Sequence, residues 1–95
     1  MLVIRSPLEG DNYIRNNIAS FDWQLFQELV SSDSLLNEED FLTLQHIIAN
    51  NEQTRYILLE DELFRFSAEN ELLYYVKWGE TREGFKITKL DVHEG

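Results

Sequence analysis

The sequence predicts an α+β domain in which two or three N-terminal helices pack on one face of a C-terminal antiparallel meander of three or four strands. Apolar residues recur with helical spacing as far as about residue 50, and from residue 54 onward short β-like runs replace them. Ninety-five residues, 43% hydrophobic and 13% aromatic, suffice for one packed core. We therefore expect residues 1–95 to form a single compact domain, with 91–95 as a flexible tail.

The chain begins with weak signals. Residues 1–5 have the composition of a short strand or a frayed end, and Pro7 is expected to end it because proline lacks an N–H and restricts the residue before it. Gly10-Asp11 is typical of a turn. Asp11 is a candidate N-cap for a short helix whose apolar side would hold Tyr13, Ile14 and Ile18.

Residues 21–31 are predicted to form an amphipathic helix. Ser20 is a suitable N-cap, and Asp22 lies in the first turn, where the helix dipole favours a negative charge. The apolar side is formed by Phe21, Leu25 and Leu29, widened by Phe26 and Val30. Trp23 lies beside this stripe, and we favour a place at the rim of the core over a fully exposed contact.

A second helix is predicted over residues 38–50, with Asn37 as its N-cap. Its first turn holds Glu38, Glu39 and Asp40, which match the positive end of the helix dipole. An acidic partner-binding cluster is the alternative interpretation. The triplet lacks the alternating spacing of a calcium loop, so a metal site is the least favoured interpretation.

The second half of the chain reads as strands. We expect strands over 55–59 and 63–67, although Glu60-Asp61 is a weak turn signal and a short helix over 60–70 is the main alternative. The clearest hairpin follows. Residues 72–78 alternate strictly, a loop spans 79–84 between two glycines, and 85–90 return with Phe85 and Ile87 inward.

Composition excludes several classes of protein. The chain has no cysteine, which excludes a disulfide scaffold, a thiolate zinc site and a cysteine nucleophile. Its first apolar run is too short for a signal peptide, and no run approaches the ~20 residues that span a bilayer. We expect a cytoplasmic protein that does not associate with membranes.

The residues that carry chemistry are sparse and scattered. The hydroxyl-rich run 31–34 has no His or Lys near it, His46 lies beside the apolar stripe of its helix, and His93 lies near the C-terminus. No phosphate-binding glycine loop, nucleophile elbow or zinc-binding histidine pair is present. We therefore predict no catalytic, cofactor-binding or metal-binding residue, and a protein that is not an enzyme.

Charge is the strongest functional signal. The net charge is −10, and residues 16–54 hold seven acids without one Lys or Arg, whereas 72–91 hold four basic and three acidic residues. Such a field repels nucleic acid phosphates and attracts basic protein surfaces. We expect a basic protein partner and no direct nucleic acid binding. The candidate partner-binding residues are Asp22, Glu28, Asp33, Glu38, Glu39 and Asp40, with Trp23 and Tyr75 as aromatic contacts.

In size and charge the chain resembles small acidic inhibitors of nucleases, restriction systems or CRISPR effectors, and immunity proteins that neutralise a basic toxin. This resemblance is one of composition and has no matching motif. It implies a non-enzymatic protein that inhibits or sequesters a basic, nucleic-acid-handling protein, for instance by mimicking nucleic acid. The alternative is a structural or adaptor subunit that associates through aromatic and apolar surface, including as a homodimer.

Overall fold

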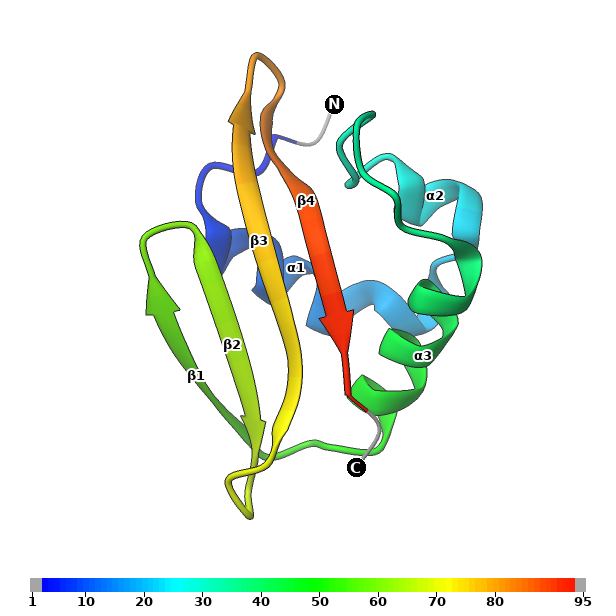
Figure 1. Ribbon diagram of the computed structural model, residues 1–95. Helices are drawn as coiled ribbons and strands as arrows, with labels where there is room; N and C mark the ends of the chain where they lie inside the picture. The colour runs from blue at the N-terminus through cyan, green and yellow to red at the C-terminus, as the bar shows by residue number, and fades with distance from the viewer. Residues whose placement is uncertain (1–2, 94–95) are drawn as a thin grey trace.

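The computed structural model describes residues 3–93. Three helices come first: α1 (Pro7–Asn17), followed by a 3-10 turn at Ile18–Ser20, then α2 (Trp23–Gln27) and α3 (Glu38–Ala49). Four strands follow: β1 (Thr54–Leu59), β2 (Glu62–Ser67), β3 (Leu72–Thr81) and β4 (Gly84–Val92). They form one antiparallel sheet in the order β1-β2-β3-β4, and the helices lie on one face of it (Figure 1). The predicted α+β architecture is confirmed.

Helix α1 begins earlier than the sequence predicted. The Ser6 hydroxyl accepts a hydrogen bond from the Glu9 N–H, and Pro7 occupies the first turn, where its missing N–H costs nothing. Gly10-Asp11 is therefore inside a helix, and the predicted turn with Asp11 as N-cap is wrong. The predicted strand is also wrong for residues 3–5, although the Ile4 C=O accepts from the Phe85 N–H at 2.8 Å. Residues 1–2 of that prediction lie outside the described part.

Helix α2 is shorter than the predicted 21–31, and its N-cap is Asp22 rather than Ser20. The Asp22 carboxylate accepts from the Leu25 N–H at 2.8 Å. The helix then ends because backbone groups of the following residues form hydrogen bonds with β4 instead. Ser31 N–H donates to the Ile87 C=O, and Ile87 N–H donates to the Leu29 C=O, both at 2.8 Å. This pairing covers the middle of the outer edge of β4.

Helix α3 confirms the predicted start and ends one residue before the predicted boundary. Asn37 and Asp40 form a capping box, in which each side chain accepts the backbone N–H of the other residue. Asp40 thus has a structural role at the N-terminus. Phe41, Leu44 and Ile47 form the buried side of the helix.

The sheet settles the alternative for residues 60–70. They form the β1–β2 turn, strand β2 and the turn that leads to β3, rather than a helix. Glu60 has a φ of 57°, which most residues avoid, so this turn lacks the glycine that usually signals it. The β3–β4 hairpin is longer than predicted. Gly79–Thr81 extends β3, and Asp91-Val92 belongs to β4 rather than to a tail, while residues 94–95 lie outside the described part.

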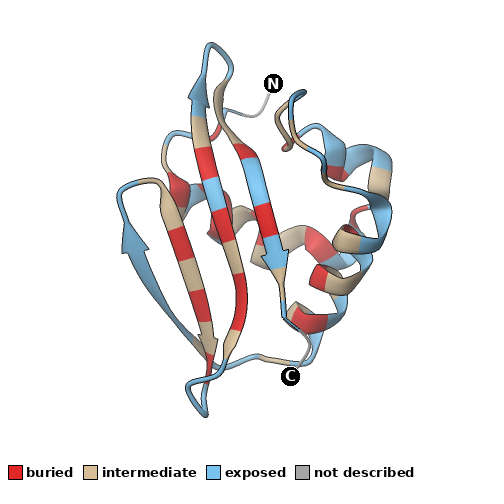
Figure 2. Cartoon of the chain, in the orientation of Figure 1, coloured by how far each residue is buried: buried red, intermediate tan, exposed pale blue. Residues whose placement is uncertain are grey.

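The core fills the space between the helices and the inner face of the sheet (Figure 2). Trp78 is completely buried on β3 and lies against Gly10 of α1. A Cβ at position 10 would lie 2.7 Å from both Cζ2 and Cζ3 of the indole, which is closer than atoms approach without movement. The absence of a side chain at residue 10 therefore sets how closely α1 approaches the sheet.

We predict that Gly10→Ala destabilises the fold by ~1–3 kcal/mol, although alanine favours helix by ~1 kcal/mol over glycine. The added methyl group meets the rigid ring of Trp78 and forces α1 or the indole to move. Urea denaturation measures the effect. Asn12→Ala, at an exposed position of the same helix, is the control and should be neutral or stabilising. An unchanged midpoint for Gly10→Ala would contradict the close packing.

Candidate functional site

The acidic candidates lie on or beside the helical layer. Asp22 precedes α2, Glu28 follows it, and Asp33 lies in the connection to α3. Glu38, Glu39 and Asp40 form the first turn of α3. All six are exposed except Asp40, which is partly covered and holds its helix cap. The carboxylates of this region therefore face solvent rather than the core.

These acids are not neutralised by ion pairs. Within residues 3–93 two ion pairs occur, Arg65 with Asp11 and Lys89 with Asp91, and neither uses an acid of the helical segment 16–54. The six candidates do not form one cluster. Asp33 and Asp40 border one shallow depression together with Lys89, whereas Glu28 borders another. The structure thus presents a broad negative surface rather than a compact acidic site.

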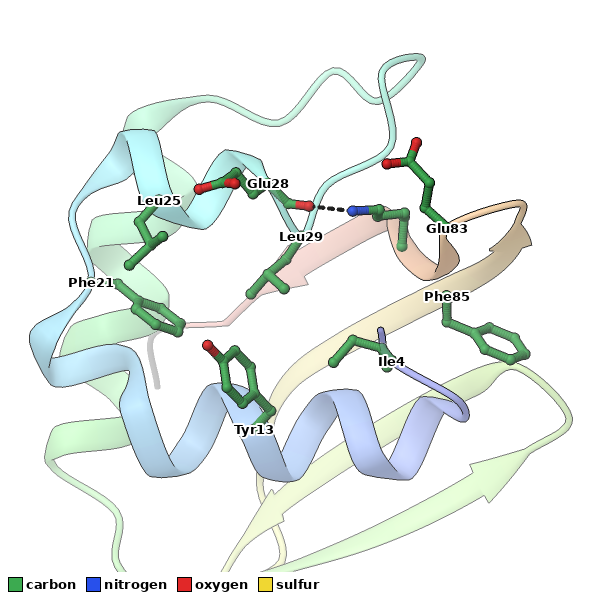
Figure 3. Close-up of a pocket in the computed structure, with 9 residues that line it drawn as sticks. Ile4, Tyr13, Phe21, Leu25, Glu28, Leu29, Glu83 and Phe85 are labelled. Carbon is green, nitrogen blue, oxygen red and sulfur yellow. Dashed lines mark hydrogen bonds between the residues drawn. The ribbon is translucent and has the colours of Figure 1, made fainter. Parts of the chain in front are cut away.

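The depression beside Glu28 lies between α1, α2 and the β3–β4 hairpin (Figure 3). Its volume is about 220 Å³, below the ~300–1,000 Å³ of ligand pockets. Lys86 Nζ donates to the Glu28 C=O at 2.6 Å and is thereby engaged by the protein itself. The remaining lining is mainly apolar: Ile4, Tyr13, Phe21, Leu25, Leu29 and Phe85, with Glu83 at the rim. We regard it as a packing defect rather than a binding site.

The two aromatic candidates are in different environments. Trp23 is half-buried, with its ring centroid 6.2 Å from that of Phe26 and 6.1 Å from that of Phe41, at the rim of the core. Tyr75 is on the opposite, outer face of the sheet. Its ring lies 4.8 Å from that of Phe64, and its hydroxyl donates to Glu62 at 2.7 Å. Tyr75 is therefore the candidate that lies away from the helical layer.

Tyr75 belongs to a set of apolar side chains that we call the outer strip. Cross-strand register places Ile57 opposite Phe64, Phe64 opposite Tyr75, and Phe66 opposite Leu72. None of these residues belongs to the core or packs against it. The outer strip consists of Ile57, Leu59, Phe64, Phe66, Leu72 and Tyr75. The helices lie on the inner face of the sheet, so the fold leaves this strip uncovered.

Strand β1 is exposed on both faces. Tyr56, Ile57, Leu58 and Leu59 are between 37% and 56% exposed, because the helical layer shields β1 less than the other strands. Sequence reasoning identified the strand but not its exposure. Four consecutive apolar residues are typical of a strand buried on both faces, so no local signal indicated an edge.

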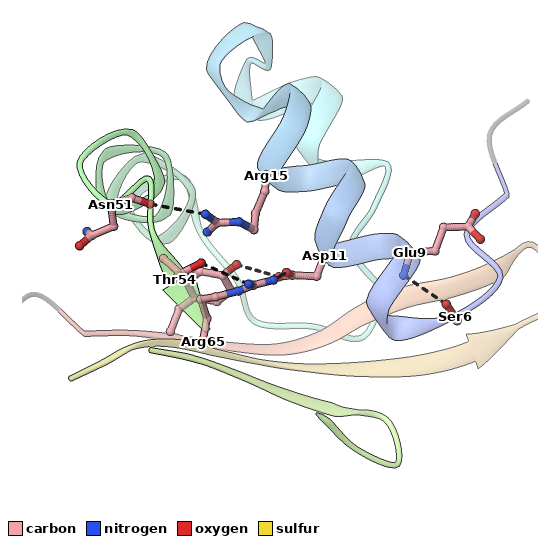
Figure 4. Close-up of polar contacts among 8 residues, drawn as sticks. Ser6, Glu9, Asp11, Arg15, Asn51, Thr54 and Arg65 are labelled. Atoms are coloured by element: carbon pink, nitrogen blue, oxygen red, sulfur yellow. Dashed lines mark hydrogen bonds and ion pairs between the residues drawn. The ribbon is translucent and has the colours of Figure 1, made fainter. Parts of the chain in front are cut away.

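One buried polar cluster connects α1 to the sheet (Figure 4). The Asp11 carboxylate forms an ion pair with Arg65 of β2 and accepts from the Tyr74 hydroxyl of β3 at 2.7 Å. Arg65 also donates to Thr54 Oγ1 at 3.2 Å. The sequence analysis did not predict this cluster. One feature of the sequence could have indicated it: Arg65 alternates with Leu63 and Ser67 on the inward-facing side of β2.

The cluster determines how its members titrate. Burial opposes the charge of Arg65, but the adjacent Asp11 carboxylate favours it, and the pKa of Arg65 is raised overall. For Tyr74, burial raises the pKa of the phenol, and the charge of Asp11 and its hydrogen bond raise this pKa further. Arg65 therefore remains charged and Tyr74 remains a neutral donor, which is a structural arrangement rather than a catalytic one.

The part of the chain that the structure describes contains no group of three or more His, Asp or Glu side chains that could hold a metal ion. Nor does any helix within residues 3–93 have the length and apolarity to cross a bilayer. Comparison with known proteins adds no relative, since no family model, curated protein or solved structure matches the chain significantly. The features that bear on function are therefore the exposed acids of residues 16–54 and the outer strip.

We predict that Asp11→Asn destabilises the protein by ~3–5 kcal/mol, since it leaves the Arg65 guanidinium buried without its counter-charge. Urea denaturation followed by circular dichroism measures the loss. Glu9→Gln, an exposed change on the same helix, should alter stability by less than ~0.5 kcal/mol. Combining Asp11→Leu with Arg65→Met should recover much of the loss, and equal stability of single and double variants would refute the pairing.

We further predict that Tyr75 ionises late. Burial of the phenol and its hydrogen bond to Glu62 raise its pKa to about 12, from an ordinary value of ~10. Because the folded state favours the protonated phenol, this contribution to stability is present below pH ~10 and is lost as the pH rises toward 12. Absorbance at 295 nm measures the titration, and Tyr75→Phe identifies the transition. Glu62→Gln should lower this pKa part of the way, and an unchanged midpoint would argue against the contact.

Proposed function

We propose that this is a non-enzymatic, cytoplasmic binding protein that inhibits or sequesters a basic protein partner. One observation carries the proposal: on the helical side, which we define as residues 16–54, the acids are exposed except for the partly covered Asp40, and none of them forms an ion pair within residues 3–93. Unpaired surface carboxylates attract a basic surface over about a Debye length, and they give up little internal stabilisation when a partner engages them.

The partner best matched to this surface is a nucleic-acid-handling protein. Proteins that bind a phosphate backbone present clustered Lys and Arg, and the energy of that binding is mainly electrostatic. An acidic protein of net charge −10 competes for such a cluster by supplying carboxylates in place of phosphates. The broad distribution of the acids favours coverage of a basic groove over insertion into one pocket.

The outer strip favours a second candidate function, that of an adaptor or structural subunit. Its aromatic members, Phe64 and Tyr75, form a contacting pair on an uncovered face, and aromatic residues are frequent anchors of interfaces. Association of this kind would be insensitive to salt and sensitive to Tyr75→Ser. The two functions are thus separable by surface and by salt dependence.

The test compares two variants with equal net charge. The helical-side variant combines Glu28→Gln, Asp33→Asn, Glu38→Gln and Glu39→Gln, and it spares the capping residues Asp22 and Asp40. The control removes four exposed acids elsewhere, through Glu60→Gln, Glu69→Gln, Glu71→Gln and Glu80→Gln. Partners are captured from nuclease-treated lysate, identified by mass spectrometry and then titrated with purified proteins.

We expect a basic partner that dissociates as salt rises, at least tenfold weaker binding (~1.4 kcal/mol) for the helical-side variant, and a smaller effect for the control. The helical-side variant should also show a flatter salt dependence. Equal affinities for both variants would count against a docking surface on the helical side. Retention at high salt, with loss on Tyr75→Ser, would favour the adaptor.

A further inference from the structure

The two edges of the sheet differ. At the β4 edge, Leu29 and Ser31 exchange backbone hydrogen bonds with Ile87. At the other edge, β1 pairs with β2 and with no other strand of the described chain. A free edge presents a row of unpaired N–H and C=O groups, which offers a template for another strand.

Strand β1 has little of what usually protects an edge, since Arg55 is its single charged residue. It contains no Lys and no Pro, and its register with β2 runs without a bulge, whereas the β2–β3 and β3–β4 pairings are both irregular. Four consecutive apolar side chains, Tyr56 to Leu59, are exposed along it. A regular, mainly apolar edge of this kind is expected to be covered in the working protein.

The hairpin geometry identifies which backbone groups are free. Leu59 and Glu62 close a two-residue turn, so they form a hydrogen-bonded pair, and hydrogen bonding to β2 alternates along the strand from there. The N–H and C=O groups of Tyr56 and Leu58 therefore point away from β2. These are the groups that an added strand would bind.

We propose that β1 pairs with β1 of a second copy, antiparallel and centred on Ile57, to give a two-fold symmetric dimer with one continuous eight-stranded sheet. Ile57 then lies opposite its own counterpart on the outer face. On the inner face, Tyr56 lies opposite Leu58 of the second copy, and both residues use the free backbone groups just described. All four exposed apolar side chains of β1 gain a neighbour.

Apolar contact along β1 selects this register, and local charge favours a second copy as the occupant. Centring on Ile57 places Arg55 opposite Leu59 of the second copy, beside the acidic turn Glu60–Glu62, and symmetry makes this contact twice. A shift that centres on Leu58 brings Arg55 opposite Asp61 but sets Tyr56 opposite Glu60, which lies outside the strand. A shift that centres on Tyr56 leaves Leu59 opposite Gln53. A basic strand would meet the same acidic turn but would set its positive charges against Arg55. A second copy supplies both acids for Arg55 and an arginine for the turn, and this local attraction acts against the repulsion between the two net charges.

The dimer differs from the proposed partner binding in its response to salt. Two copies of net charge −10 repel each other, and salt screens that repulsion while the apolar contact persists. Dimerisation should therefore strengthen as salt rises, whereas capture of a basic partner should weaken. Failure of one proposal is thus distinguishable from failure of the other.

Cross-linking tests the register directly, because the chain has no native cysteine. Ile57→Cys places two thiols opposite each other in a non-hydrogen-bonded pair, where Cα atoms lie ~4.5 Å apart, within the range that a disulfide bridges. We expect Ile57→Cys to form a disulfide-linked dimer at least tenfold faster than Leu59→Cys on mild oxidation. Leu59 is equally exposed on the same face but is placed opposite Arg55. Equal rates, or no cross-linking of Ile57→Cys, would overturn the register.

Sedimentation equilibrium of the full chain over a range of concentration and salt tests the dimer itself. Ile57→Lys places two ammonium groups at the two-fold axis and should weaken dimerisation at least tenfold. Leu35→Lys, at a side chain 97% exposed outside β1, is the matched control and should have little effect. Circular dichroism confirms that both variants fold. A wild-type protein that stays monomeric at the highest soluble concentration and at high salt overturns the proposal and assigns β1 to a different partner's strand.

Discussion

The position of α1 on the sheet is set by the buried ion pair between Asp11 and Arg65, which joins residues 54 positions apart. Burying two charges costs more than their attraction returns unless hydrogen bonds satisfy the remaining groups. Here Tyr74 donates to the second carboxylate oxygen and Thr54 accepts from the guanidinium, so β1, β2 and β3 all contribute. The buried Nε of Arg65 has no hydrogen-bond partner within residues 3–93, so the cluster is satisfied only in part. The preceding residue, Gly10, lets the same helix approach Trp78. Adjacent residues thus set both the position and the distance of α1.

The same arrangement explains why β1 remains exposed. The contact between α1 and the sheet is made on β2 and β3, through Arg65 and Tyr74, and the buried part of the helical layer lies over β2 to β4. Beyond it, the Arg65 guanidinium lies 5.1 Å from the Tyr56 ring centroid and marks the boundary of the covered inner face. A polar cluster at that boundary stabilises the helix–sheet contact without extending an apolar surface over β1.

Local patterns in the sequence predicted what local physics determines. Helical spacing located α3, and alternation located the β3–β4 hairpin and placed Tyr75 opposite to Tyr74. The predicted alternation is wrong at the start of β3, where Leu73 and Tyr74 are both buried and Leu72 lies on the outer face, because the pairing with β2 is irregular there. The predictions that were wrong concern features that depend on distant residues or on ambiguous local signals. Ser6-Pro7 suits the end of a strand and the start of a helix equally, and α2 ends early because β4 bonds the backbone of Leu29 and Ser31. Asp11 suits the N-cap of a helix by residue type, but in the structure its carboxylate pairs with Arg65, which lies far along the chain. Of the candidate site, exposure of the acids on the helical side could be predicted, but the open β1 edge could not.

The two proposed surfaces are coupled by electrostatics even though they do not overlap. Edge pairing through β1 leaves the helical side of each copy free, so a dimer would present two acidic surfaces to a partner. Charge repulsion between the copies opposes that dimer, and a bound basic protein would neutralise part of it. Linkage requires reciprocity: a partner that favours the dimer must itself bind the dimer more tightly than the monomer, by the same factor. An acidic monomer with an open edge is therefore suited to assemble on a basic target, because the target relieves the repulsion that keeps its copies apart.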